Sequence, residues 1–410
     1  MFLNNTVGVN TMTEKIFLEN PYLSEIDARI TEKKYLKNKF YLKLNRTIFY
    51  PNLAGGQPKD EGKINDIDVI DVFEEGGDIV HVIEKNINSD KVHLKIDLNL
   101  RFDYMQQHSG QHLLSAVFYK LYNGKTLGFH IGSEYSYIDI DISDFNEEEA
   151  KKVETFANKV IYSNLPIKTY EILKDDVSKI PVRQKPTVDS NIRIVEIDGF
   201  DFCPCCGTHC KATGEIGIVK IRKWEKQKRN IRIEFSCGFR ALNDYSWKNS
   251  YINKISNILS TKDKDVLHKF EKLFTEYENL EKDNRDLREE LLIYKAKNLL
   301  KESQLKNGVR IIKKIFIDTD FKEVSFISSY LKENENVLTL FTVINQEKCQ
   351  FIFSRNKLIK VNMQRILKAI QNSIPEIKGG GNSQTVQGGS APEKADEILD
   401  MAFDLIMEGI

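Results

Sequence analysis

Two motifs contain the residues best suited to chemistry. His108 and His112 lie four positions apart in QHSGQH, and Cys205 and His209 have the same spacing in CCGTH. On a helix, residues four apart share one face, with Cβ atoms about 6 Å apart, which suits two ligands of one ion. One thiolate and three imidazoles form a complete tetrahedral set for zinc. The two motifs together therefore predict a Zn2+ site.

The number of ligands bears on what this ion would do. Four protein ligands are typical of a closed structural site, whereas a catalytic zinc keeps one coordination position open. Either one ligand is displaced and leaves room for water or a substrate group, or the ion organises a pocket whose water is activated by other means. Cys206 could replace Cys205 as a ligand or could simply pack, and Cys203 and Cys210 are expected not to be ligands.

Two glycine-rich segments could also contact a ligand. In AGGQP, Gly55 and Gly56 allow close approach of a backbone and Gln57 offers an amide, although an ordinary tight turn has the same composition. A second run, predicted to be a loop whose N–H groups could hold a phosphate, comprises Gly379, Gly380 and Gly381. No GK[ST] sequence follows this run, which excludes a P-loop ATPase.

The stretch from 211 to 240 is rich in Lys and Arg. It contains few acidic residues and includes Trp224, whose ring could stack on a base. A basic segment next to the cysteine motif suggests a polyanion such as RNA, and a solvated hairpin would show the same charges. The candidate nucleic-acid contacts are Arg222, Lys223, Lys226 and Arg229.

Composition limits the class of protein. The chain has 410 residues, of which 41% are hydrophobic, with 60 Lys and Arg against 60 Asp and Glu. This length and composition exclude a disordered or a small disulfide-stapled protein. The apolar runs are far shorter than the roughly 20 residues that span a bilayer, and the first residues lack the pattern of a signal peptide. We therefore expect a cytoplasmic protein without a membrane partner, whose zero net charge averages over unlike segments.

The elements that position these residues follow from changes of pattern along the chain. Residues 1–100 contain short β-rich runs that fit a small β-barrel or sandwich, and we expect a barrel that carries the glycine motif. Residues 101–246 combine helices, expected at 109–122 and 147–163, with alternating strands, and predict an α+β zinc-binding domain. The fold class is therefore α+β. The histidines expected to be surface or core residues without a ligand role are His81, His93, His130 and His268.

The second half of the chain begins with a predicted long helix in residues 247–305. Apolar residues recur at alternating spacings of four and three from Val266 to Tyr294, with Asn284 at one core position, which is a coiled-coil pattern. An antiparallel hairpin within one chain and a coiled coil between two chains both fit. Residues 306–410 show a βαββα pattern, the glycine-rich loop and a last helix starting at Pro392 after a cap at Ser390, and they predict an α/β domain.

These motifs resemble a known family. HSGQH, followed downstream by CCGTH and TGEIG, resembles the second additional domain of alanyl- and threonyl-tRNA synthetases. LNRTIFYP, GGQP, TLGFHIG and RIEFSCGFRAL are similar to motifs of free-standing alanyl-tRNA editing proteins of the AlaX type. GGGNSQTVQGGS and the final helix resemble the DHHA1-type tail domain. The resemblance covers nearly the whole chain, as in the long AlaX form, without an adenylation segment or a DHH motif.

The resemblance implies hydrolysis of the ester in tRNA(Ala) mischarged with serine, with glycine as a second candidate. It implies zinc ligands at His108, His112, Cys205 and His209. It also implies that Thr47 recognises the serine hydroxyl, and the family's glycine motif matches Gly55, Gly56 and Gln57. Two positions depart from the commonest pattern: Ala54 replaces the first glycine of GGGQP, and Cys206 replaces a glycine of CGGTH. The amino-acid selectivity is therefore less defined than ester hydrolysis.

Our hypothesis is a zinc-dependent aminoacyl-tRNA hydrolase whose substrate enters between the barrel and the metal domain. The helical segment and the C-terminal domain would form a homodimer and hold the tRNA. No Asp, Glu or His stands out as a dedicated base, so positioning, polarisation and a placed water would supply the catalysis. The alternatives are a non-catalytic tRNA-binding protein with a structural zinc, and a metallohydrolase acting on a small ester or amide.

Overall fold

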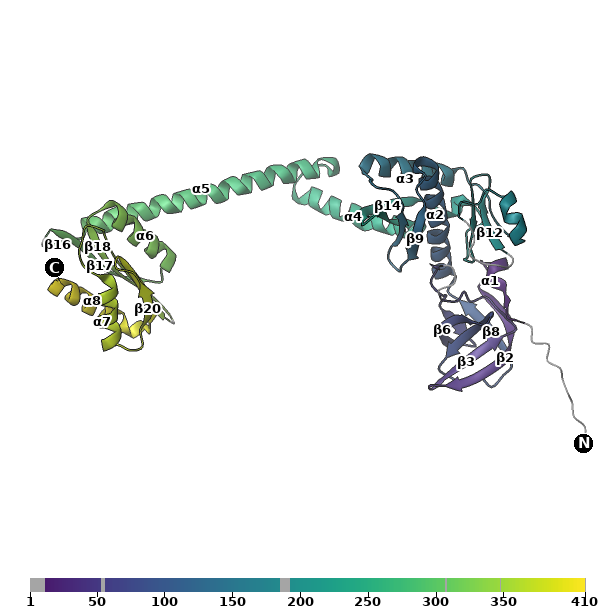
Figure 1. Ribbon diagram of the computed structural model, residues 1–410, viewed down its shortest axis with the longest axis horizontal. Coiled ribbons are helices and arrows are strands. Elements are labelled where there is room, and N and C mark those ends of the chain that lie inside the picture. Colours follow the sequence, from purple (N-terminus) through teal and green to yellow (C-terminus); the bar gives the residue numbers. More distant parts are fainter. Residues whose placement is uncertain (1–11, 53–55, 185–191, 307, 347, 410) are drawn as a thin grey trace, which may run out of the picture. The chain divides into compact units, whose positions relative to one another are not determined.

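The computed structural model describes residues 12–52, 56–184, 192–306, 308–346 and 348–409 (Figure 1). The chain divides into two compact units, Met1–Ile255 and Ser256–Ile410. The boundary falls in helix α4 (Gly238–Ile258), within the predicted helical segment 247–305. Among the described residues, no helix combines the length and the apolar character that a membrane span requires.

Six antiparallel strands of the first unit form a closed barrel. In barrel order they are β2 (Glu25–Leu36), β3 (Lys39–Leu44), β7 (Asp78–Ile83), β6 (Ile67–Glu75), β5 (Gly62–Ile64) and β8 (Lys91–Ile96). In β8, exposed and buried residues alternate strictly, and Val92 and Leu94 pack into the barrel core with Leu42. A short parallel pair, β1 (Glu14–Lys15) and β4 (Arg46–Thr47), and helix α1 (Ile16–Glu19) complete this part.

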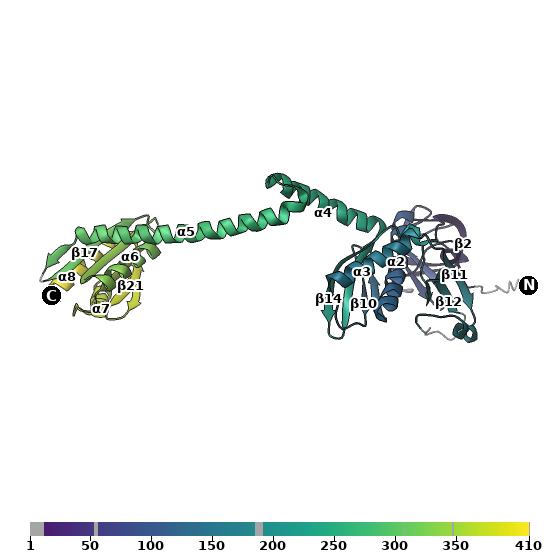
Figure 2. The same ribbon diagram turned by 90° about the horizontal axis from the view of Figure 1, so that it is seen from above.

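The rest of the first unit is an α+β domain. Helices α2 (Leu98–Tyr122) and α3 (Glu147–Tyr162) contact each other and pack on a four-stranded antiparallel sheet (Figure 2). The sheet order is β14 (Val219–Gln227), β15 (Asn230–Cys237), β10 (Ser136–Ile140) and β9 (Thr126–Ile131). Between β10 and β14 the chain forms a separate three-stranded antiparallel sheet of β11 (Ile167–Ile172), β12 (Ile192–Ile197) and β13 (Asp201–Pro204).

The two helices differ in how well the sequence predicted them. Helix α3 agrees with the predicted range 147–163. It starts at the expected position because Asn146 and Glu149 form a reciprocal capping box there. Helix α2 begins at Leu98, well before the predicted start at Ser109, because the Asp97 carboxylate accepts hydrogen bonds from the backbone N–H groups of Asn99 and Leu100. The extra turns place both His108 and His112 in the buried middle of one helix.

A buried ion pair joins the barrel to α2. The Arg101 guanidinium of α2 is fully buried and donates through Nε to Asp60 Oδ1 at 2.8 Å, with a second bond to Asp60 Oδ2. It also donates to the carbonyl oxygen of Ile48 at 2.7 Å. Burial raises the pKa of Asp60, and the Arg101 charge opposes that rise. The pair fixes α2 against the segment that carries the glycine motif.

The second unit contains a six-stranded mixed sheet with three helices and the long helix α5 (Val266–Lys301). The sheet order is β16 (Gln304–Lys306), β17 (Val309–Ile317), β18 (Val337–Asn345), β19 (Lys348–Arg355), β21 (Thr385–Ser390) and β20 (Lys378–Gly381). The helices are α6 (Phe321–Asn334), α7 (Met363–Ser373) and α8 (Ala395–Gly409). Short 3-10 turns in the chain span Lys174–Lys179, Thr213–Ile216, Asp263–Asp265 and Pro392–Lys394. The predicted βαββα order is confirmed by β17, α6, β18, β19 and α7.

Two expectations for this unit were wrong. The glycine run is not a loop, because Gly379, Gly380 and Gly381 form the edge strand β20 and pair with β21. Glycine is disfavoured in strands, so the composition concealed this hairpin. Ser390 does not cap the last helix either, since it ends β21 and Pro392 begins a 3-10 turn before α8.

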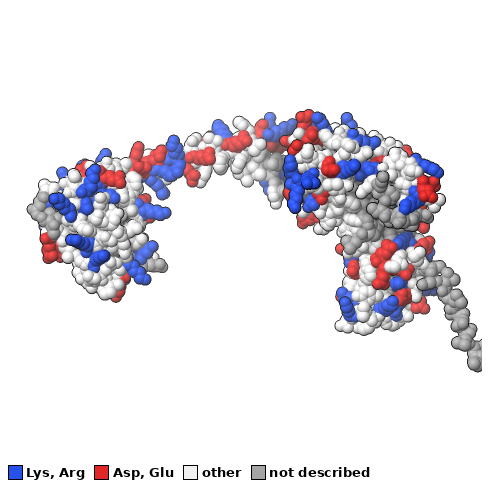
Figure 3. Space-filling view, in the orientation of Figure 1, with Lys and Arg blue, Asp and Glu red and all other residues white. Residues whose placement is uncertain are grey.

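The predicted apolar seam lies on α5 and is exposed in the single chain. Only Val266 at its start is buried, whereas Phe270, Tyr277 and Leu287 are at least 53% exposed. On the face drawn in Figure 3, Lys and Arg alternate with Asp and Glu along α5. An apolar stripe between charged flanks is the surface that a coiled-coil partner covers.

Candidate metal centre

The four predicted ligands meet in the first unit. One ligand atom from each of His108, His112, Cys205 and His209 lies within 4.8 Å of all the others. Cys205 Sγ is 3.4 Å from both His108 Nε2 and His209 Nε2. Zinc bond lengths of about 2.0 to 2.3 Å place tetrahedral ligand atoms about 3.3 to 3.7 Å apart, so the spacing fits one ion. The predicted grouping of the two motifs is confirmed, and Cys203, Cys206 and Cys210 are not in the cluster.

The local sequence allows the helix and the cysteine loop to come this close. Helix α2 presents His108 and His112, and the loop after β13 presents Cys205 and His209. A Cβ atom on Gly207 would lie 2.1 Å from Cε1 of His108, so only glycine lets the loop pass this ring. A tight turn also directs the Gly207 backbone N–H toward Cys205 Sγ at 3.4 Å, where it stabilises a thiolate.

Gln57 of the glycine motif is hydrogen-bonded to the metal-cluster residue His108. Its Oε1 lies 3.1 Å from His108 Nδ1 and accepts from the Thr208 backbone N–H at 3.1 Å. Its Nε2 lies 2.8 Å from the Thr208 hydroxyl. An N–H donated from Nδ1 to Gln57 leaves the lone pair of Nε2 free for a metal. The barrel segment thus sets the tautomer of a ligand on α2.

Burial gives the cluster the protonation states that metal ligands need. Burial, with a smaller contribution from Arg193, lowers the pKa of His108 to about 3. Burial likewise holds the pKa values of His112 and His209 well below the usual range, so all three imidazoles are neutral. The pKa of the Cys205 thiol is raised by burial to about 12, so binding of an ion would displace its proton.

One atom of the cluster also lacks a partner. His112 Nδ1 is buried and has no hydrogen-bond partner among the residues that the structure describes. A buried polar atom without a partner costs roughly 1 to 3 kcal/mol unless an ion or a water satisfies it. The donor set, the spacing and this atom all fit zinc.

The glycine motif meets an aromatic ring. Gly56 has a φ of +76°, and a Cβ atom there would lie 2.5 Å from the Phe129 ring. The Phe129 ring in turn is 5.7 Å from the ring of His108. The space that glycine leaves at position 56 is therefore occupied by the ring of Phe129 in β9. Phe129 was not among the predicted site residues. Gly55 and Ala54 lie outside the described residues.

Thr47 is buried in the barrel beside His81. Its hydroxyl lies 2.8 Å from His81 Nε2 and accepts from the Phe49 backbone N–H at 3.1 Å. His81 Nδ1 faces the Leu42 carbonyl at 3.3 Å and must donate to it, so Nε2 accepts the Thr47 proton. Burial lowers the pKa of His81 to about 4, which keeps this arrangement neutral. His81 is the expected core residue, and its link to Thr47 has no sequence signal.

The predicted basic hairpin forms from β14 and β15, and most of its candidate cations are paired. Arg222 Nη1 donates to Glu234 at 2.8 Å, and Lys223 lies 3.4 Å from Glu225. Lys226 reaches Asp144 of a distant loop at 3.2 Å. Arg229 is exposed and has no ion pair among the residues that the structure describes. Trp224 is half-buried and packs edge-on against Phe145, so its ring is engaged within the core.

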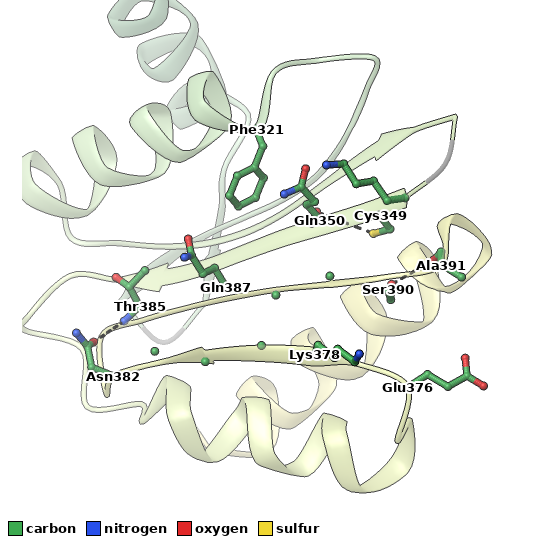
Figure 4. A pocket seen from close by; sticks show the side chains of 16 residues that line it. Phe321, Cys349, Gln350, Glu376, Lys378, Asn382, Thr385, Gln387, Ser390 and Ala391 are labelled. Carbon is green, nitrogen blue, oxygen red and sulfur yellow. Dashed lines mark hydrogen bonds between the residues drawn. The ribbon is translucent and has the colours of Figure 1, made fainter. Parts of the chain in front are cut away.

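The other candidate contacts line a groove of about 960 Å3 in the second unit (Figure 4). Strand β20 provides one edge, with Gly379 opposite Gly388 of β21, so no side chain covers the backbone there. The groove is also lined by Phe321, at the start of α6, and by two cationic side chains, Lys348 and Lys378. The three glycines belong to the second unit and the metal cluster to the first.

The fold and the site define a class of protein. A barrel joined to an α+β domain with a His3Cys centre is followed by a separate domain with a glycine-rich hairpin. Residues 192–234, which include Cys205 and His209, match the family described as threonyl and alanyl tRNA synthetase second additional domain. Residues 308–408 match the DHHA1 domain family. The class is that of proteins built from a synthetase-type additional domain and a DHHA1 domain.

Relatives identify the family within that class. The alanyl-tRNA editing protein AlaX-L of Pyrococcus horikoshii is 33% identical, covering 96% of this chain and 98% of its own length. Alanyl-tRNA editing protein Aarsd1-A of Xenopus laevis is 30% identical over 78% of each chain. The alanine–tRNA ligase of Methanobrevibacter smithii is 29% identical over 96% of this chain and 46% of the ligase. The chain belongs to the AlaX-L family of alanyl-tRNA editing proteins.

Proposed function

We propose that the chain is a trans-editing deacylase that hydrolyses the ester of mischarged tRNA(Ala), chiefly Ser-tRNA(Ala), with Gly-tRNA(Ala) as a second substrate. Family membership supports the reaction class. The single observation that carries the proposal is the buried His3Cys cluster beside the glycine-motif residue Gln57. The cytoplasm, where charged tRNA is used, is the expected location.

Zinc would be held by His108, His112, Cys205 and His209. When bound, it would polarise the ester carbonyl or orient the amino group of the aminoacyl end. Gln57 and Thr208 hold His108 in one tautomer, and Gly207 keeps the cysteine loop against α2. An aminoacyl ester is already activated, so a held geometry and an ordered water suffice without a dedicated base.

Thr47 would provide the preference for serine. Because its proton is donated to His81, the hydroxyl oxygen retains acceptor capacity only. A serine hydroxyl can donate to that oxygen, whereas the methyl group of alanine would leave it unpaired. Serine would therefore be released faster than alanine, and the cognate Ala-tRNA(Ala) would be spared.

RNA contacts would come from both units. Arg229 and its neighbours on the β14–β15 turn would meet the tRNA near the metal domain, with Arg222, Lys223 and Lys226 contributing less because they are ion-paired. In the second unit, the backbone of Gly379, Gly380 and Gly381 would approach RNA closely in the groove of Figure 4.

A homodimer would cover the exposed seam of α5. Phe270, Leu280 and Leu291 are 53%, 67% and 52% exposed, which is unusual for apolar residues at core positions of a heptad pattern. Asn284 would pin the register, as polar core residues do in coiled coils. A second copy of the chain supplies an equal stripe.

Deacylation of Ser-, Gly- and Ala-tRNA(Ala) tests the function. We expect rapid release of serine, slower release of glycine and little release of alanine. Thr47→Val should lower the serine rate at least tenfold, whereas Thr47→Ser, which retains a hydroxyl, should lower it less. Equal rates for the three esters would contradict the selectivity.

A structural zinc is the second candidate, because all four ligands are protein side chains and the three histidines are at most 4% exposed. It predicts tRNA binding without turnover.

A further inference from the structure

A second cationic surface lies in the C-terminal unit, outside the segments that the sequence analysis singled out. From residue 348 to residue 375 the chain contains no Asp or Glu. The six cations in this stretch are Lys348, Arg355, Lys357, Lys360, Arg365 and Lys368. A run without acidic residues has no counterions of its own.

Five of these cations, from Arg355 to Lys368, lie in the segment that runs from the end of β19 into the first turns of α7. Strand β19 ends at Arg355, and α7 begins at Met363. The Arg355 backbone N–H donates to the Gln384 carbonyl at 2.9 Å, and the Met363 N–H donates to the Ser383 carbonyl at 3.1 Å. The segment therefore wraps the turn that joins β20 and β21. We call these five residues the 355–368 surface.

The charges of this surface are available. Lys357, Lys360, Arg365 and Lys368 are exposed, and none has an ion pair with any residue that the structure describes. The Arg355 guanidinium donates to the backbone carbonyls of Ser383 at 3.2 Å and Asn356 at 3.0 Å, so it keeps a full charge while it orders the turn. The β14–β15 hairpin differs, since three of its four candidate cations contact carboxylates.

We infer that the 355–368 surface binds the phosphate backbone of RNA, which under the proposed function is the body of the tRNA. Cations without partners give up no ion pair when they bind phosphate, and each neutralised phosphate releases counterions. Asn382 and Thr385 line the groove of Figure 4 and flank the turn residues that this segment contacts. The segment that carries the cations and the wall of the glycine groove therefore meet at this turn, which suits an extended polyanion better than a compact anion.

Binding of uncharged tRNA(Ala) by the full-length protein tests the inference without requiring catalysis. The variant is Lys357→Gln/Lys360→Gln/Arg365→Gln/Lys368→Gln. The matched control removes four exposed cations without ion pairs in the described part of the first unit: Lys85→Gln/Lys91→Gln/Lys151→Gln/Lys159→Gln. Fluorescence anisotropy from 50 to 300 mM salt gives the Kd and its salt slope, and thermal unfolding verifies the fold.

We expect the variant to weaken binding at least tenfold at 100 mM salt and to lower the slope by about three to four, close to one for each lysine or arginine lost. The control should change the slope by less than one. Equal behaviour of variant and control would overturn the inference. So would unchanged tRNA binding together with lost binding to vesicles of anionic lipid, because the surface would then serve a membrane. Failure of the proposed function would look different. If the chain were not a deacylase, neither the wild type nor the variants would release serine from a short acceptor minihelix. If the chain is a deacylase, this variant should cleave that minihelix normally.

Discussion

The metal centre and the 355–368 surface each depend on a few side chains, but in opposite ways. At the metal centre, His108, Gln57 and Thr208 are buried and each is hydrogen-bonded to another. On the surface, Lys357, Lys360 and Lys368 are exposed and have no ion pair with described residues. Loss of a buried member leaves other polar atoms unsatisfied, whereas loss of an exposed one changes little else.

This difference determines how large the effect of a single replacement should be. Coupled buried residues give large, non-additive effects, and separated surface charges give small effects that add. Replacements at the metal centre should therefore have larger effects than replacements of exposed cations, and equal effects would contradict this ranking.

Replacement of a ligand should have the largest effect. His209→Ala should lower the rate of serine release by about 10^4-fold, roughly 5 kcal/mol, because zinc would be lost together with its effect on the ester. Metal analysis should show less than one zinc per chain. Cys206→Ser is the control, since Cys206 is exposed and outside the cluster, and it should keep both zinc and activity. A zinc-free control variant would mean that Cys206 is a ligand.

Breaking the buried ion pair should destabilise the first unit. Asp60→Asn leaves the fully buried Arg101 without its counterion, which costs about 3 to 5 kcal/mol in urea unfolding. Lys59→Met breaks the more exposed pair with Asp71 and should cost no more than about 1 kcal/mol. Similar losses in the two variants would contradict the role assigned to burial.

The stability of the zinc-loaded protein should depend on His81 at acid pH. The folded-state pKa of about 4 lies below the usual value of about 6.5, so the unfolded chain binds one more proton between these values. Stability should therefore fall as pH drops from 6.5 to 4, with about 3 kcal/mol due to His81 at pH 4. In the His81→Gln variant, the free energy of unfolding measured in urea should change less steeply between pH 4 and 6.5, by the equivalent of one bound proton. A profile parallel to that of the wild type would exclude a neutral, buried His81.

The support of His108 by Gln57 should have an intermediate effect. Gln57→Leu removes the acceptor of His108 Nδ1 and should lower zinc affinity or activity by about 10- to 100-fold. Competition with a zinc chelator measures the affinity. Thr208→Ser keeps the hydroxyl that meets Gln57 and should stay within about threefold of the wild type. A larger loss in the serine variant would shift the supporting role to the Thr208 methyl group.

The paired cations of the hairpin should have the smallest effect. Lys223→Gln/Lys226→Gln removes side chains that already contact Glu225 and Asp144, so tRNA affinity should fall by less than about threefold. Arg229→Gln, without an ion pair among described residues, is the contrasting variant and should weaken binding more. A tenfold loss of tRNA affinity in the double variant would show that these lysines contribute to binding despite their ion pairs.

The sequence was most informative where chemistry fixes the spacing of residues. The HxxxH and CxxxH motifs identified all four members of the cluster, because two ligands of one ion that are four residues apart need a shared helix face or a tight turn. The heptad pattern likewise predicted a long helix, and α5 runs from Val266 to Lys301. Local capping chemistry at Asn146 set the start of α3.

Long-range partners could not be predicted in this way. Gln57 and Thr208 are 151 positions apart, and Thr47 and His81 are 34 apart, so no spacing rule connects them. The carboxylate that pairs with Lys226 is 82 positions away, which is why the basic run looked like a free patch. The glycine strand β20 depends on pairing with β21, which overrides the weak strand propensity of glycine.

Release of serine from Ser-tRNA(Ala) by the zinc-loaded, full-length protein is the most direct test of the central claim, that the His3Cys centre hydrolyses the aminoacyl ester. We predict release far faster than in buffer, yielding free serine and tRNA(Ala) that can be charged again, and loss of this activity in Cys205→Ala. Serine release no faster than in buffer, or full activity in Cys205→Ala, would contradict the claim.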